Sequence, residues 1–379
     1  MVKCCELCGG QLMQLPIPFV GRAMVSDGRI LKESLKKTSC LFCGLVSHVQ
    51  QPSGEITEAV YGTNYALATA SPDSDKARGS NYANVLTKLV TPAKRILEVG
   101  CGSGALLKEL QTHWPEASLH GIDPSVPSNL THHERIQFER GFFDTYLADA
   151  KSYDLIISIN VIEHVADPKA FFSRAASLLS EAGQLAIFCP ASNPPNLELV
   201  LHDHLHTFTS NALVLLAASA GFTLSKKIEH LDPLGDFQFI LFNRSRTHVS
   251  CDHFFLKRDE TSLAIQRIEY LQAWNHLEEE LWARTAFASR LVLFGAGQMA
   301  ALLRTYAPHI WERVDLLVVD NADEAWVFEK QVKSYAEMQP ILSNIAILIA
   351  TAPSSQAYLA SRLESDGLNP VRFDDVISR

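Results

Sequence analysis

A glycine-rich turn between a predicted strand and a predicted helix constrains the fold of this chain more than any other feature. The run RILEVG (95–100) is short, apolar and ends in glycine, and the helical pattern ALLKELQTHW follows it. Between them lies Glu98-Val-Gly100-Cys-Gly102-Ser-Gly104. Glycines at such a turn let the backbone pass close to a ligand and let the strand pack against the helix. The pattern therefore predicts an α/β unit with a ligand site at the end of its first strand.

Strand and helix patterns alternate along the chain after this turn. The runs SLHGID (118–123), YDLIISIN (153–160) and QLAIFCP (184–190) predict strands, and residues 167–183 and 211–222 predict helices. This alternation is typical of parallel βαβ units in a doubly wound sheet. The sequence therefore predicts an α/β, Rossmann-like core over residues 61–245.

Five of the eight cysteines fall within the first 43 residues. They include two Cys-x-x-Cys pairs, Cys5/Cys8 and Cys40/Cys43, each followed by glycine, whereas Cys4 lacks the spacing to pair with Cys8. In this pattern the backbone turns back so that both thiolates reach one ion, and four thiolates close a tetrahedral zinc shell with no open position. We therefore expect a structural zinc module over residues 1–60, with buried free cysteines as the alternative.

The last third of the chain, residues 246–379, repeats the α/β pattern. Residues 260–289 carry apolar side chains at helical spacing, and the runs RLVLFG, VDLLVVD and IAILIA predict strands of a smaller Rossmann-like domain. Its turn Gly295-Ala-Gly297-Gln-Met-Ala300 and Asp320, at the end of the next strand, form a nucleotide-binding pattern. Many domains keep such a turn without a cofactor, so the pattern leaves a ligand here open.

Charge and hydropathy narrow the class of partner. The formal net charge is −9, from 33 basic and 42 acidic residues, and this disfavours non-specific binding to nucleic acid or anionic membrane. No apolar run approaches the roughly 18–20 residues needed to span a bilayer, and MVKCCELC lacks the apolar core of a signal peptide. We therefore expect a cytoplasmic protein that acts on a small molecule, and the sequence leaves its oligomeric state open between a monomer and a homodimer.

The acid two positions before Gly100 distinguishes the first turn from a dinucleotide-binding turn. Glu98 would repel a pyrophosphate but suits a cationic amino group. Asp123 ends the next predicted strand, where an acid hydrogen-bonds a ribose diol. A ligand with a ribose and an amino-acid tail is S-adenosylmethionine (SAM). A nicotinamide or other nucleotide is the alternative.

The runs ILEVGCGSG, GID and YDLIISINVIEHVADP resemble those of the class I SAM-dependent methyltransferases, over about residues 78–225. The resemblance implies that the turn glycines line the methionine end of SAM and that Asp123 binds the ribose. At the adenine end, either Phe142 stacks or Asp144 takes the place of the usual aspartate. His164 would face the acceptor or serve the structure. The residues implied for cofactor binding are Glu98, Gly100, Cys101, Gly102, Gly104, Asp123, Pro124, Phe142, Phe143, Asn160, Val161 and Ile162.

The order of zinc pairs, methyltransferase core and extra α/β domain resembles the nucleotide-sugar C-methyltransferases of deoxysugar pathways. The segment LHDHLHTFT (201–209) is similar to their Tyr-x-Glu-His-x-x-x-Phe-Ser segment, which carries acid–base residues. By position, Asp203 and His204 match the Glu-His pair, whereas Leu201 stands in the place of the tyrosine. Tyr61 and Tyr65 would lie near the cofactor and substrate, with packing as the alternative.

The resemblance implies a base-assisted methyl transfer. Methylation of carbon beside a ketone needs a base for the α-proton and support for the enolate oxygen, and a histidine oriented by a carboxylate is a common base. We therefore expect His204, Asp203 and His164 to be catalytic on a nucleotide-linked keto sugar. A polar loop or a second metal site is the alternative for the His-rich segment. For the whole chain, the alternatives are an O- or N-methyltransferase acting on another metabolite, a zinc-module RNA methyltransferase and a dehydrogenase.

Overall fold

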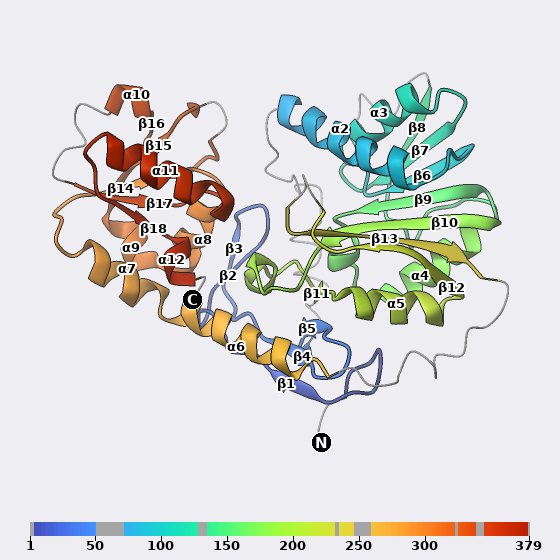
Figure 1. Ribbon diagram of the computed structural model, residues 1–379, viewed down its shortest axis with the longest axis horizontal. Helices are drawn as coiled ribbons and strands as arrows, with labels where there is room; N and C mark the ends of the chain where they lie inside the picture. Colours follow the sequence, from blue (N-terminus) through green and yellow to red (C-terminus); the bar gives the residue numbers. More distant parts are fainter. Residues whose placement is uncertain are drawn as a thin grey trace. The chain divides into compact units, whose positions relative to one another are not determined.

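The computed structural model describes residues 4–50, 72–127, 135–231, 235–245, 259–322, 325–338 and 345–377, and its chain forms two compact units (Figure 1). The first unit comprises Met1–Gln14, Thr38–Pro194 and His204–Ala264, and the second comprises Leu15–Lys37, Pro195–Asp203 and Ile265–Arg379. The chain therefore passes from one unit to the other several times. The domain boundaries expected near residues 60 and 245 adjoin or fall within ranges that the structure does not describe, and they stay predictions.

The first unit contains a seven-stranded sheet in the order β12-β13-β10-β9-β6-β7-β8. The five strands from β10 to β8 are parallel, whereas β13 runs antiparallel to β10 and β12 antiparallel to β13. The predicted α/β core is confirmed as a mixed sheet. The strands are β6 (Arg95–Val99), β7 (Ser118–Asp123), β8 (Ile136–Arg140), β9 (Tyr153–Ile159), β10 (Leu179–Pro190), β12 (Phe222–Ile228) and β13 (Phe237–Arg244).

Alternate side chains of each central strand enter two separate apolar cores. Ile96 of β6 packs with α2 (Pro72–Leu89) and α3 (Ala105–His113), whereas its neighbour Leu97 packs with α4 (Pro168–Leu178) and α5 (Ser210–Ser219). This follows from the two-residue side-chain period of a strand, which exposes both faces of a buried sheet to helices. The helix predicted over 167–183 ends at Leu178, because β10 begins at Leu179.

The N-terminal residues contribute to both units. In the first unit, β1 (Leu12–Gln14), β4 (Lys37–Cys40), β5 (Val46–His48) and β11 (His206–Thr207) form a small sheet in the order β1-β4-β5-β11. In the second unit, β2 (Ala23–Met24) and β3 (Ile30–Leu31) form a short antiparallel hairpin. Two 3-10 turns follow β9 and β10 along the chain: η2 (Ile162–His164) in the first unit and η3 (Leu197–Val200) in the second.

The second unit is built on a five-stranded parallel sheet in the order β16-β15-β14-β17-β18. Its strands are β14 (Leu291–Phe294), β15 (Val314–Val319), β16 (Val332–Ser334), β17 (Ala346–Ile349) and β18 (Pro370–Arg372). The helix expected over 260–289 is divided into α6 (Thr261–Asn275) and α7 (Leu277–Thr285) at His276. The remaining helices are α8 (Gln298–Tyr306), α9 (Pro308–Arg313), α10 (Tyr335–Met338), α11 (Pro353–Ser365) and α12 (Asp374–Ile377).

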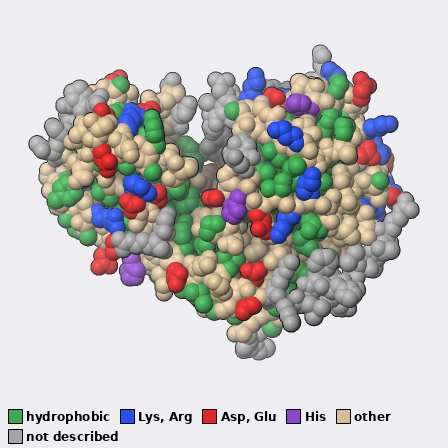
Figure 2. Space-filling model, in the orientation of Figure 1, with side chains coloured by type: hydrophobic (Ala, Val, Ile, Leu, Met, Phe, Trp, Pro, Cys, Tyr) green, Lys and Arg blue, Asp and Glu red, His purple; other side chains and the backbone are tan. Residues whose placement is uncertain are grey.

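The expected partners stay predictions, and the structure shows the following surface and helix properties. On the face seen in Figure 2, Lys and Arg side chains are interspersed with Asp and Glu rather than gathered into a stripe. Within the described part of the chain, no helix combines the length and the apolar character needed to cross a membrane.

Candidate functional site

The turn between β6 and α3 has the left-handed backbone that the glycine pattern predicts. Gly100, Gly102 and Gly104 have φ angles of 76°, 49° and 71°. A Cβ atom at Gly100 would lie 2.2 Å from Val161 Cγ2, and one at Gly104 would lie 2.4 Å from Phe138 Cζ. A Cβ atom at Gly102 would meet nothing within 4 Å. Two of the glycines therefore allow close packing, whereas Gly102 borders open space that a ligand can enter.

Asp123, at the end of β7, is tied to this turn. Its Oδ2 accepts a hydrogen bond from the Gly102 backbone N–H at 3.0 Å, and its Oδ1 accepts from the Ser125 N–H at 2.7 Å and from the Ser125 hydroxyl at 2.5 Å. The carboxylate is therefore held beside Gly102, in the position where the sequence predicts the ribose.

Glu98 is the most unusual acid of this region. Its side chain is buried, 4% exposed, and its Oε2 has no hydrogen-bond partner among the described residues. Burial, followed by the nearby Asp123, raises the pKa of Glu98 well above its usual value. A buried acceptor without a donor is costly, at about 1–3 kcal/mol or more for a charged group. Because a ligand ammonium would satisfy this oxygen, the residues present fit the amino group of SAM.

Sequence reasoning missed Arg78, a residue of α2 that belongs to the same region. Its charge favours the ionised form of Glu98 and opposes the effect of burial on the pKa of that carboxyl. Arg78 pairs with Asp75 at 3.2 Å, and Asp75 accepts a hydrogen bond from the Ser103 hydroxyl in the glycine turn. A single arginine in a polar helix carries no sequence signal. The neighbouring Gly79 is a sequence signal for close packing of α2 on α3. A Cβ atom there would lie 2.8 Å from the Ala105 carbonyl carbon at the start of α3.

The end of β9 supplies the next group of expected cofactor residues. Asn160 has φ 53°, donates its N–H to the Phe188 carbonyl at 3.0 Å, and has a buried Oδ1 without a partner among the described residues. Val161 fills the space above Gly100, and Ile162 is fully buried in the core. Asn160 is therefore the member of this group with a polar atom left for a ligand.

The remaining expected cofactor residues differ in exposure. Phe142 is 51% exposed, whereas Phe143 is buried and packs on Phe171 with ring centroids 5.0 Å apart. Pro124 is half-buried beside Asp123. Cys101 is buried, and burial raises the pKa of its thiol, so this cysteine stays protonated near neutrality. Of the two phenylalanines, Phe142 is the one accessible for stacking.

The four expected zinc ligands lie together in the first unit. Cys5 Sγ and Cys43 Sγ are 3.8 Å apart, Cys8 Sγ and Cys40 Sγ are 3.5 Å apart, and all four sulfurs lie within 4.8 Å of one another. A tetrahedral zinc with bonds of ~2.3 Å places its sulfurs about 3.8 Å apart. The donor set and the spacing therefore fit a zinc ion.

We define the expected acid–base segment as residues 201–209. The first unit contains His204 and the residues of the segment that follow it. The rings of His164 and His204 meet edge to face, with centroids 4.6 Å apart. His206 lies in β11, where it pairs with Ser47 of β5, and its Nδ1 is 2.9 Å from the Ser47 hydroxyl. Thr209 donates its hydroxyl to the Cys43 carbonyl at 2.7 Å. The structure therefore brings His164 and His204, both expected to be catalytic, to one place.

Asp203 and His202 belong to the second unit, since the boundary between the units follows Asp203. Asp203 is buried; its Oδ1 accepts from the Ser26 N–H at 2.8 Å and its Oδ2 accepts from the Ser26 hydroxyl. His202 Nε2 lies 2.7 Å from Glu33 Oε1. Neither Ser26 nor Glu33 was expected from the sequence, because both are polar residues of the loop between the two cysteine pairs and match no motif.

Lys37 anchors the start of the same segment within the second unit. The side chain is buried, and its Nζ donates to the Glu198 carbonyl at 3.1 Å and to the Leu201 carbonyl at 2.8 Å. Burial lowers the pKa of Lys37 to about 7, although Glu198 and Asp203 oppose this shift. Leu201, which stands where the resembling enzymes have a tyrosine, is buried.

Two members of the nucleotide pattern of the second unit have close neighbours within the protein. A Cβ atom at Gly295 would lie 2.2 Å from the Ala350 carbonyl oxygen, so this glycine allows close contact with the end of β17. Asp320 forms two bonds to Arg362, at 2.8 and 2.9 Å. The acid of the nucleotide-binding pattern is thus engaged by a guanidinium.

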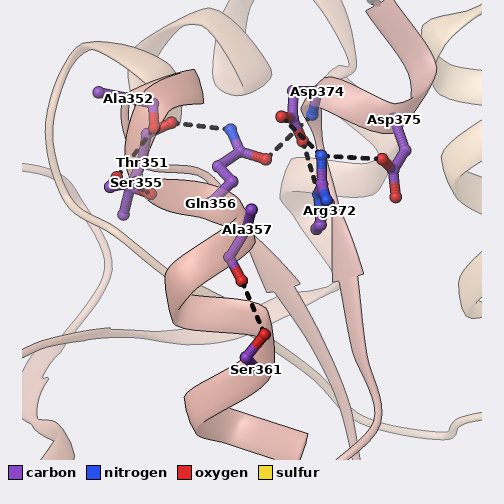
Figure 3. Close-up of polar contacts among 9 residues, drawn as sticks. All are labelled: Thr351, Ala352, Ser355, Gln356, Ala357, Ser361, Arg372, Asp374 and Asp375. Carbon is purple, nitrogen blue, oxygen red and sulfur yellow. Dashed lines mark hydrogen bonds and ion pairs between the residues drawn. The ribbon is translucent and has the colours of Figure 1, made fainter.

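Polar bonds also fix the sheet edge where α11 begins (Figure 3). Gln356 donates to the Thr351 carbonyl at 2.8 Å and accepts from the Asp374 N–H at 3.0 Å, and Ser355 donates to the Thr351 hydroxyl at 2.9 Å. Arg372 in turn pairs with Asp374 at 3.0 Å. This network holds the ends of β17 and β18 together.

Tyr61 and Tyr65, which were expected near the cofactor and substrate, lie outside the described residues.

Comparison with known proteins gives a partial match. A family model described as a methyltransferase domain matches residues 72–227. A ubiquinone biosynthesis O-methyltransferase from Nitrobacter winogradskyi is 32% identical over 99 residues, which are 24% of this chain and 37% of that protein. The enzyme of the same name from Coxiella burnetii is 29% identical over 105 residues, which are 26% of this chain and 44% of that protein. The chain therefore spans less than half the length of these relatives.

Similarity to solved structures is lower. The crystal structure of 1,6-didemethyltoxoflavin-N1-methyltransferase from Burkholderia thailandensis is 17% identical, covers 55% of this chain and 96% of that chain, and has a TM-score of 0.41. The match to the family model includes the acidic glycine turn between β6 and α3. Residues 72–227 are therefore similar to a methyltransferase domain.

Proposed function

We propose that this protein transfers a methyl group from SAM to a small molecule, and that its acceptor is a nucleotide-linked keto sugar. The observation that carries the proposal is the buried Oε2 of Glu98, which has no hydrogen-bond donor among the described residues. Beside it lies the glycine turn, in which the Gly102 N–H donates to the Asp123 carboxylate. These groups suit the ammonium and ribose of one ligand. When bound, SAM supplies an electrophilic methyl group on a sulfonium.

Different residues around the turn bind different parts of SAM. Glu98 accepts from the ammonium, Asp123 accepts from the ribose hydroxyls, and Phe142 stacks on the adenine. Arg78 stands near Glu98 and provides a cation for the carboxylate of the amino-acid tail. Asn160 offers its buried Oδ1 at the end of β9. The acids and the arginine thus match both charges of the methionine end.

The acid–base segment supplies the acceptor chemistry. A histidine there removes the proton from the atom to be methylated, and a second polar group supports the oxygen that becomes negative. The contact between His204 and His164, next to the end of β9, supports a role for His204 near the transferred methyl. The two tasks need two groups, and the segment contains three histidines.

We also propose that the four-cysteine cluster holds a structural zinc ion. A shell of four thiolates leaves no position for water, so the ion would stabilise the fold without taking part in the transfer. The cluster borders the acid–base segment through the Thr209 bond to Cys43 and the pairing of β5 with β11. Bound zinc would therefore stabilise β5 and, through it, β11, the strand that contains His206.

The proposal is tested by calorimetric titration of dTDP, UDP, GDP and NAD into the zinc-loaded full chain saturated with S-adenosylhomocysteine (SAH). Saturable SAH binding followed by tight binding of one nucleoside diphosphate is the expected result and names the base. A chain that binds no SAH would refute methyl transfer. Binding of NAD would revive a dehydrogenase function of the second unit.

The second candidate is O-methylation of another metabolite. The ubiquinone biosynthesis O-methyltransferases noted above favour it, because they are 32% and 29% identical to this chain over 99 and 105 residues. Binding of SAH without any of the four nucleotides would support this candidate over the sugar. A panel of phenolic and hydroxy-acid acceptors, with SAH release as the readout, would then be the next assay.

A further inference from the structure

A buried tyrosine of α2 that belongs to none of the sequence motifs lies at the carboxyl edge of the seven-stranded sheet. Tyr82 is 4% exposed, and its ring meets that of Phe188 in β10 edge to face, with centroids 5.2 Å apart. Phe188 in turn pairs with Ile159, the last residue of β9. The helix therefore brings Tyr82 to the strand ends where the sequence predicts the cofactor.

Tyr82 and Glu98 lie on the same face of this sheet. Tyr82 packs in one apolar core with Ile96 of β6, and Glu98 follows Ile96 by two residues along the same strand. Side chains two residues apart on a strand point to the same face. The buried acid that we assign to the ammonium of SAM therefore points to the face that α2 covers.

Asn160 lies between this tyrosine and the glycine turn. It follows β9, whose Ser158 pairs with Val99 of β6, so it is level with the start of the turn. Its backbone N–H donates to the carbonyl of Phe188, the residue on which the Tyr82 ring packs. Asn160 and Tyr82 therefore share a neighbour at the end of the sheet.

A hydrogen bond joins the two side chains. Burial raises the pKa of Tyr82 to about 12, although the charge of Arg78 and the bond from the Asn160 side chain oppose this shift. The Oδ1 atom of Asn160 is buried and has no partner among the described residues. The amide nitrogen therefore makes the bond to Tyr82, and the amide oxygen is left for a ligand.

The part of SAM that suits a lone amide oxygen is the sulfonium. This group carries a positive charge but no N–H or O–H, so an acceptor attracts it and a donor repels it. An asparagine side chain offers both at its two ends, and a half-turn of the amide exchanges them. A partner on the nitrogen decides which end faces the ligand. The sulfonium joins the amino-acid tail to the ribose, the parts that we assign to Glu98 and Asp123.

We propose that Tyr82 is a positioning residue that holds the Asn160 amide with its oxygen toward the sulfonium, so that the site prefers SAM over SAH. This assignment rests on the proposed function, and both residues lie in the first unit. During transfer the bond between sulfur and methyl carbon breaks and its electron pair stays on sulfur, which becomes neutral. The attraction to Oδ1 is lost with that charge, so the arrangement also favours release of SAH.

The test compares the equilibrium affinities of SAM and SAH for the zinc-loaded full chain without an acceptor, by calorimetry. Tyr82→Phe removes the hydroxyl and keeps the ring against Phe188. Asn160→Gly removes the amide, and glycine adopts the φ of 53° at this position without strain. Tyr153→Phe is the matched control, because this buried tyrosine at the start of β9 bonds to the Tyr146 hydroxyl at 2.6 Å.

The readout is the affinity for SAM divided by the affinity for SAH. A partly unfolded sample lowers both affinities equally, so loss of stability does not change this ratio. We expect it to fall about threefold or more in Tyr82→Phe and about tenfold in Asn160→Gly, the sizes typical of a neutral hydrogen bond and of a bond to a charged group. Tyr153→Phe should keep the wild-type ratio.

The double variant tests whether Tyr82 acts through Asn160. Tyr82→Phe should change the ratio no further in the Asn160→Gly background, because the amide that it positions is gone. A wild-type ratio in Tyr82→Phe, the same fall in both backgrounds, or an equal fall in Tyr153→Phe would overturn the positioning role. If the wild type binds both ligands, such a result leaves the proposed function standing, whereas a wild type that binds neither ligand overturns both.

Discussion

Replacement of Gly102 by alanine separates a ligand-facing glycine from a packing glycine. Gly102 has φ 49°, and a Cβ atom there meets no protein atom within 4 Å. The only cost to the fold is the left-handed backbone, about 1–2 kcal/mol for an L-residue. The thermal midpoint should therefore fall by roughly 2–8 °C, at about 2–4 °C per kcal/mol for a domain of this size.

The added methyl group occupies the space that we assign to the cofactor. We expect Gly102→Ala to weaken SAH binding at least about tenfold, which corresponds to about 1.4 kcal/mol. Gly221→Ala is the matched control, because its φ is 81° and its Cβ would lie no closer than 4.0 Å to the Ser245 carbonyl oxygen. It should lose similar stability and bind SAH normally.

Gly104→Ala extends the comparison, since its Cβ would lie 2.4 Å from Phe138 Cζ. Overpacking adds about 1–3 kcal/mol to the backbone strain, so this variant should be less stable than Gly102→Ala. Differential scanning calorimetry and titration with SAH measure both effects. Wild-type SAH affinity in Gly102→Ala would refute the assignment of this turn to the cofactor.

Three further variants test other parts of the structure. Cys40→Ser removes one thiolate of the proposed zinc shell, so zinc measured by mass spectrometry should fall well below one ion per chain, and a full complement would contradict the site. Arg78→Met removes the cation beside Glu98 and should weaken SAH binding about tenfold, or 1.4 kcal/mol, in calorimetry; equal affinity would exclude Arg78 from the site. Lys37 has a pKa lowered to about 7 in the folded chain, below its unfolded value of about 10.4. Between these values the unfolded chain keeps a proton that the native chain loses, so wild-type stability should rise with pH relative to Lys37→Met, and parallel curves from pH 7 to 10 would contradict burial of this amine.

The sequence by itself determined the features that are encoded locally. The alternation of apolar runs and helical patterns predicted the α/β core, because side-chain periods of 2 and 3.6 follow from backbone geometry. The spacing of Glu98, the turn glycines and Asp123 predicted a ligand site at the ends of β6 and β7, since the carboxyl ends of neighbouring parallel strands meet at one edge. The two cysteine pairs likewise predicted the cluster of sulfurs.

Other features were decided only by the tertiary structure. The sequence pattern did not reveal that β12 and β13 run antiparallel, because an apolar strand reads the same in either direction. In the sequence the three turn glycines look alike. Only the structure shows that Gly100 and Gly104 pack against other side chains, whereas Gly102 borders open space.

The partners of the acid–base segment are the clearest case. The carboxylate of Asp203 accepts from Ser26, and Glu33 meets His202. These contacts join residues more than 160 positions apart, and a lone serine or glutamate in a loop has no periodicity or spacing that marks it. Folding alone decides which polar side chain reaches a buried acid or histidine, because burial makes an unpaired polar group costly and selects the neighbour that can satisfy it.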